Sequence, residues 1–103
     1  MACVVDADPE RARERARSYA QLYLGLRNYT NTLRRFGFSD DDIADRGSPR
    51  LLDAVVPQGS PDAIAAVARA HLDAGADHVC VQPVDVAGIP RDEWTALAAA
   101  LAD

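Results

Sequence analysis

The sequence contains no lysine, because all eleven of its basic residues are arginine. Without lysine, the chain cannot form a Schiff base with a carbonyl substrate, and it cannot supply the phosphate-binding lysine of a P-loop. It also lacks any apolar run near the roughly 18 residues that a membrane-spanning helix needs. Met1 leads directly into a short strand-like segment, not into a charged region followed by an apolar signal core. These absences indicate a cytoplasmic protein with no membrane partner.

Net positive charge is absent, and cysteine is scarce. The formal net charge is −5 at pH 7, whereas nucleic acids bind basic surfaces, so we expect no nucleic-acid partner. The two cysteines, Cys3 and Cys80, both fall in strand-like segments. In a chain without a secretory signal, this placement indicates two buried free thiols, not a disulfide or a metal pair.

The common catalytic motifs are missing as well. The sequence has no GxSxG elbow, no GxGxxG after its first strand, no P-loop and no HExxH. The acidic run from Asp40 to Asp42 lacks the spacing and the glycine of an EF-hand, so it is more typical of a helix start than of a cation site. We therefore expect neither a metal site nor a catalytic residue in this chain.

The most informative segment that is present is GSPDAIAAVARAHLDAGADHVCVQP, residues 59–83. Ser60 and Pro61 are typical of a helix start, and Gly75 is typical of a helix end. The apolar run that follows predicts a strand of the parallel kind, which is buried on both faces and needs neighbouring strands in a sheet. This unit indicates a parallel α/β protein.

The other segments complete a single domain over residues 1–103. The order Asp8-Pro9-Glu10 predicts a helix start after a short apolar strand, and the middle of the chain breaks into short helices. The expected elements are a strand over 2–5, a helix over 9–26, a helical insertion over 27–58, a helix over 60–74, a strand over 77–82 and a helix over 91–102.

Polar residues follow the predicted parallel strands. In parallel α/β barrels the functional groups lie where the strands end. That rule selects Asp6 to Asp8 after the first strand, Gln82 and Pro83 after the later strand, and the helix start at Gln58-Gly59-Ser60. A helix N-terminus with a Gly-Ser lead can hold a phosphate on its backbone amides, although the negative charge of Asp62 disfavours this.

Four segments, in this order, resemble the C-terminal part of luciferase-like monooxygenases, in particular the F-420-dependent oxidoreductase branch. They are VVDADPERARERAR, YLGLRNYTNTLRRFGF, DDDIADRGSPRLLDAVVPQGSPDAIAA and AHLDAGADHVCVQP. The similarity covers nearly all of residues 4–83. Its most specific part is NYTNTLRRFGF joined to GSPDAI, because helix-glycine-strand junctions such as AGADHV recur in many barrels.

The resemblance implies the C-terminal strand-helix units of an incomplete TIM (β/α)8 barrel. It implies coenzyme F-420 or FMN in the complete enzyme, with hydride transfer to a small organic substrate or its oxygenation. The missing N-terminal barrel portion would supply the catalytic histidine and most of the cofactor pocket. We therefore expect this chain alone to be inactive and to bind no cofactor tightly. No catalytic residue carries over, and Tyr29 and Asn31 are implied only as pocket or interface contributors.

Two other readings remain open. The chain fits a small non-catalytic interaction module or oligomerising remnant, whose partner is a second copy or another protein. It also fits another parallel barrel enzyme that shares only the AGAD junction. Both the luciferase-like fragment and the interaction module leave sheet edges and apolar helix faces uncovered. We therefore expect the isolated chain to be molten, aggregated or oligomeric.

Overall fold

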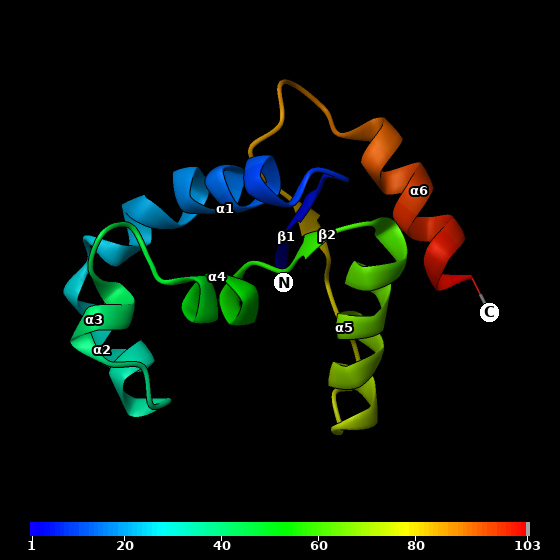
Figure 1. The fold of residues 1–103 in the computed structure, drawn as a ribbon. Helices are drawn as coiled ribbons and strands as arrows, with labels where there is room; N and C mark the ends of the chain where they lie inside the picture. The colour runs from blue at the N-terminus through cyan, green and yellow to red at the C-terminus, as the bar shows by residue number, and fades with distance from the viewer. Residues whose placement is uncertain (103) are drawn as a thin grey trace.

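The computed structural model describes residues 1–102, which form helices packed on both faces of a small sheet (Figure 1). Six helices and three strands occur in this range. In chain order they are β1 (Ala2–Val5), α1 (Pro9–Leu24), α2 (Arg27–Arg35), α3 (Asp40–Ile43), α4 (Pro49–Val55), β2 (Gln58–Gly59), α5 (Pro61–Asp73), β3 (Gln82–Pro83) and α6 (Arg91–Leu101).

The sheet is parallel and has the strand order β2-β1-β3. The first strand of the chain is therefore the central one. Val4 lies opposite Gln58, and Val5 lies opposite Gly59. On the other side, Ala2 lies opposite Gln82, and Cys3 lies opposite Pro83. Both later strands thus pair with β1 and not with each other.

This topology corrects the expected fold class, since the chain is not a set of strand-helix units of a TIM barrel. Successive strands of such a barrel lie side by side around the ring, which would place β2 between β1 and β3. Here β1 separates them. Within residues 1–102, only β1 reaches four residues, while β2 and β3 have two each. The fold is a mainly helical domain around a three-stranded parallel sheet.

Short polar side chains start the main helices. The carboxylate of Asp8 accepts the backbone N–H of Glu10 at 3.0 Å, and the Oγ of Ser60 accepts the N–H of Ala63 at 3.1 Å. In both helices a proline occupies the first turn, where its missing N–H costs nothing. Helix α1 ends at Leu24, because Gly25 caps it and a new helix begins at Arg27.

The strand expected over residues 77–82 is shorter and later in the structure. Only Gln82 and Pro83 form β3, while residues 77–81 have no regular secondary structure. β1 begins at Ala2, and Met1 before it bonds to Cys80 and Gln82, so residues 77–79 have no partner in this strand. Cys3 is fully buried as expected, but Cys80 is exposed, so the expectation of a second buried thiol is wrong.

The two faces of the sheet have separate cores. Val4 points into the larger core, where it meets the buried Ala12 and Ala16 of α1 and the buried Leu51 and Leu52 of α4. Neighbouring Cys3 points the other way and packs with Ile64 of α5 and Leu97 of α6. Successive side chains of a strand face opposite sides, so a single central strand joins the two cores.

Candidate functional site at the carboxyl edge of the sheet

Asp6 directly follows Val5, the last residue of β1, and it is 8% exposed. Its carboxylate accepts two hydrogen bonds from Arg11, from Nε and Nη2, both at 2.7 Å. It also accepts the N–H of Asp8 at 3.0 Å and Nη1 of Arg15 at 3.3 Å. The hydrogen bonds from Arg11, more than any other contact, hold the pKa of Asp6 well below its usual range.

Arg15 connects this carboxylate to the loop after β3. Its Nη2 donates to the carbonyl oxygen of Asp85 at 2.9 Å, and its Nε lies 3.4 Å from the Asp85 carboxylate. Its Nη1 also donates to the carbonyl of Val5 at 3.3 Å. We call Asp6, Arg11, Arg15 and Asp85 the Asp6 cluster. It ties the end of β1 to the loop that leaves the sheet.

The chemistry of the Asp6 cluster is that of a closed ion network. Two carboxylates face two guanidinium groups, and the bidentate geometry of Arg11 is the strong kind of charge-assisted pair. A general base works best when its pKa lies near the working pH, whereas the pKa of Asp6 is lowered and its carboxylate is bonded to Arg11 and Arg15. The geometry is therefore suited to holding strands together, not to proton transfer.

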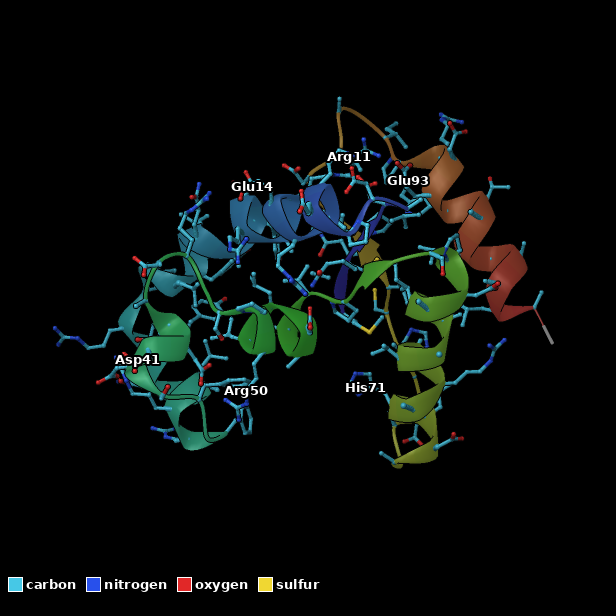
Figure 2. All side chains as sticks on the ribbon, viewed as in Figure 1. Arg11, Glu14, Asp41, Arg50, His71 and Glu93 are labelled. Atoms are coloured by element: carbon cyan, nitrogen blue, oxygen red, sulfur yellow. The ribbon has the colours of Figure 1, made fainter. Side chains whose placement is uncertain are left out.

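A polar hollow of about 480 Å³ lies next to the Asp6 cluster. Arg15 and Asp85 line one side of it, and Arg91, Asp92 and Glu93 at the start of α6 line the other. Figure 2 shows Arg11 and Glu93 on the same side of the molecule, where α1 and α6 begin. Its lining carries charges of both signs and no aromatic ring, which does not suit a flat redox cofactor.

Besides Asp6 to Asp8, two more of the residues selected from the sequence lie at this edge. Gly59 accepts the N–H of Asp6 on its carbonyl at 3.0 Å, and its φ of +136° is a conformation that favours glycine. Ser60 follows it, and the Ser60 hydroxyl accepts the N–H of Ala63 as the cap of α5. Both residues already have structural roles at the start of this helix.

Gln82 does not lie at the carboxyl edge. The register places it opposite Ala2, at the start of β1, and continuing that register puts Asp85 level with Val5. The apolar run in the sequence ends at Gln82, but the chain continues alongside β1 through Val84, whose N–H bonds to the carbonyl of Cys3 at 2.9 Å. Asp85 is thus the residue that the strand-end rule should have selected.

Tyr29 lies in a different place again, in a second hollow of about 820 Å³ between α1, α2 and α4. Its ring stands 4.9 Å from that of Tyr23, which lies 5.2 Å from that of Tyr19. Burial, followed by the contact with Tyr23, raises the pKa of Tyr19 to about 12. We call this hollow the aromatic groove; its aromatic lining residues are Tyr19, Tyr23, Tyr29, Phe36 and Phe38.

The aromatic groove and the Asp6 cluster lie at opposite ends of β1. Ala2, the first residue of that strand, lines the groove, whereas Asp6 follows the last residue of the strand. The four candidates Gly59, Ser60, Gln82 and Tyr29 therefore do not converge on one cavity.

The sequence reading missed Arg11 and Arg15. Their spacing of four residues places them on one side of α1, directly after the flagged Asp6, and this was the available signal. Glu14 and Arg17 lie three residues apart on α1 and form an ion pair at 4.0 Å, and Glu14 bonds more closely to Arg46, at 2.8 Å.

Neither a metal site nor a membrane span was found in the described part of the chain. Among residues 1–102, no group of three or more His, Cys, Asp or Glu side chains is placed to hold a metal ion. None of the helices described here is both long enough and apolar enough to cross a bilayer.

Comparison with known proteins adds no relative to these observations. No family model matches the chain, and no curated protein or solved structure shows a significant match to it.

Proposed function

We propose that the chain contributes the C-terminal part of a luciferase-like oxidoreductase that uses coenzyme F-420 or FMN. In the whole protein, the reaction is hydride transfer to a small organic substrate, or its oxygenation. The observation that carries this proposal is the order of the four family-like segments, above all NYTNTLRRFGF joined to GSPDAI. We place the protein in the cytoplasm, in keeping with its two free cysteines.

In this proposal the chain has a supporting role, and the catalytic groups and the cofactor pocket belong to the rest of the protein. The scattered positions of Gly59, Ser60, Gln82 and Tyr29 support that division. So does the Asp6 cluster, whose carboxylates are all engaged with arginines. The partner is the missing N-terminal portion or a second copy of the chain.

A second candidate function is a non-catalytic interaction module, and the exposed apolar side chains favour it. Phe36 is 76% exposed, and Leu22, Ile89 and Trp94 are at least half exposed. Large apolar side chains in solvent mark a surface that packs against a partner when they line a groove. Phe36 lines the aromatic groove. This function needs no cofactor.

Two measurements test these candidates, and the second one separates them. Reduced F-420 and FMN are titrated into the purified chain, and we expect no stoichiometric binding. Tight binding would contradict the assignment of the pocket to another part of the protein. If weak binding occurs, Tyr29→Ala and Gln82→Ala, which lie in separate places, show whether the groove is involved.

The second measurement is the DNA sequence upstream of the Met1 codon. The oxidoreductase proposal expects the rest of the family pattern there, in frame or after a frameshift. Unrelated sequence at that place favours the interaction module.

A further inference from the structure

The outer edge of β3 is open. Alternate residues of this segment bond to the start of β1: the Cys80 carbonyl accepts the Met1 amino group at 2.7 Å, and the Gln82 N–H donates to the Met1 carbonyl at 2.9 Å. Residues 79–81 precede β3 and are not part of it. The bonds of Cys80 and Gln82 to Met1 nevertheless alternate as in a strand, and this alternation directs the N–H and C=O of Val79 and Val81 to the outer side. No residue among 1–102 bonds to these four groups.

The four free groups suit an antiparallel strand of the same sequence. Residues that face each other in an antiparallel pair exchange two hydrogen bonds at every second position. When Val79 faces Val81 of a second copy, Val81 also faces Val79 of that copy, and all four groups of each chain are satisfied. Cys80 then faces Cys80 of the second copy on a twofold axis, with Cα atoms about 4.5 Å apart.

Neighbouring registers satisfy fewer groups. A shift in one direction places Pro83 opposite Val79, and proline has no N–H to give to the Val79 carbonyl. A shift in the other direction places Asp77 opposite Val81, and Asp77 lies in a bend. Pro83 and Asp77 therefore limit the pairing to the residues between them.

Charge and exposure also agree with a second copy as the occupant. In this register Asp77 faces Pro83 and His78 faces Gln82, so no like charges meet. Residues 78–84 contain no carboxylate, although the chain carries a net charge of −5. Val79 and Val81 are half-buried, and Val81 packs on the core that contains Cys3 and Ile64. The Cys80 side chain is exposed, as the register requires for its approach to a second Cys80.

The other edge of the sheet offers much less. Strand β2 has two residues, Gln58 and Gly59, and it follows Pro57, which has no N–H. A glycine and a proline at such a short edge disfavour further pairing. Of the two sheet edges described in residues 1–102, the edge on the β3 side presents two alternate residues, Val79 and Val81, whose N–H and C=O groups both face outward.

We propose that two copies of the chain pair through their β3 edges, antiparallel, with Val79 opposite Val81 and Cys80 on the twofold axis. The dimer has a continuous sheet with the order β2-β1-β3-β3-β1-β2. It is a closed, isologous contact, which stops at two copies. This inference does not depend on the oxidoreductase proposal, because it rests on the backbone and side chains of residues 77–84 alone.

Oxidation with diamide tests the position of Cys80. The reagent takes two electrons and two protons as two thiols join, and the Cα separation expected at the axis lies within the range of about 4.4–6.8 Å for disulfides. We expect a covalent dimer of twice the 11.1 kDa chain mass, linked through Cys80 and not through Cys3. Cys80→Ser should abolish the covalent dimer but keep the non-covalent one in sedimentation.

The register is tested in a Cys80→Ser background. Mixing a His78→Cys chain with a Gln82→Cys chain should give a mixed disulfide, because these positions face each other. Each variant alone is the matched control and should crosslink several-fold less. Equal crosslinking in all three samples would overturn the register.

Proline substitution tests the hydrogen bonds. Val79→Pro removes an outward N–H and should convert the dimer to a monomer, whereas His78→Pro removes an N–H on the other side and should not. Val79→Ala separates the loss of the side chain from that of the hydrogen bond. If circular dichroism shows that Val79→Pro has unfolded, the disulfide pattern decides, since it leaves the backbone intact. A chain that is monomeric at every concentration would overturn the proposal.

Discussion

The two ends of β1 contrast in the kind of contact that they make. At the carboxyl end, the charged groups of the Asp6 cluster find their partners within the chain, and Asp6 is 8% exposed. At the amino end, Ala2 opens into the aromatic groove, and Phe36 on its rim is 76% exposed. At these two ends, the chain thus satisfies the charged groups of the Asp6 cluster and leaves apolar side chains of the aromatic groove uncovered. We therefore expect a partner to contact the aromatic groove or the open strand edge, and not the Asp6 cluster.

The largest effect should come from the floor of the aromatic groove. Leu51 lines the groove but is fully buried, so Leu51→Ala should lower the free energy of unfolding by about 2–5 kcal/mol. Urea denaturation followed by circular dichroism measures this loss. A change below about 1 kcal/mol, well under the usual cost of such a cavity, would mean that the groove floor is not packed as described.

A smaller loss should follow from Asp6→Asn at the opposite end. The neutral amide can no longer pair with the guanidinium groups of Arg11 and Arg15, and it leaves them facing each other. We expect a lower urea midpoint at neutral pH. Asp53→Asn is the matched control, because Asp53 is exposed and lies 3.5 Å from Arg13, and it should change the midpoint little.

The pH dependence of stability is a second test of the contact between Asp6 and its arginines. The folded pKa of Asp6 is lowered, and that of Asp42 is lowered from 3.8 to about 2, chiefly by the hydrogen bond from Ser48. Below pH 3.8 the unfolded chain therefore takes up protons first, and stability falls as the pH falls further. The fall should be shallower in Asp6→Asn. An unchanged slope would remove Asp6 from the acid-sensitive groups.

The smallest effect on stability should come from the groove rim. Phe36→Ala removes a ring that is 76% exposed, so the free energy of unfolding should change by less than about 0.5 kcal/mol. Its effect on association, measured by sedimentation, should be larger if a partner covers the groove. A stability loss comparable to that of Leu51→Ala would show that the rim is already packed within the chain.

The starts of several helices could be predicted from short local signals. Asp8-Pro9, Ser48-Pro49 and Ser60-Pro61 each combine a capping side chain with a proline, and α1, α4 and α5 begin at these prolines. These capping contacts join residues two or three positions apart, so they can be recognised from local sequence without knowledge of the tertiary structure.

The sheet could not be predicted in the same way. Strand β2 has only two residues, Gln58 and Gly59, which are too few to show the alternating pattern of a strand. Because β2 could not be predicted, the central position of β1 in the sheet could not be predicted either. The position of Gln82 depends on its register with Ala2, which local sequence does not encode.

The candidate site was predicted in part. Strand-end reasoning selected Asp6, but Arg11 and Arg15 were not singled out, because their partners Asp6 and Asp85 lie outside α1 and only the fold brings them to it. The resemblance to luciferase-like proteins led to a barrel that the strand order excludes.

The central position of β1 also has a consequence for how the chain reaches its fold during synthesis. Within this chain β1 is synthesised before β2 and β3, yet its Ala2 lies opposite Gln82, 80 residues later in the sequence. Contacts of such long sequence separation slow folding, because loop closure precedes any gain from pairing. Translation at about 5–20 residues per second leaves the strand without its second neighbour for seconds. During that interval the apolar segment Cys3-Val4-Val5 is a target for chaperones.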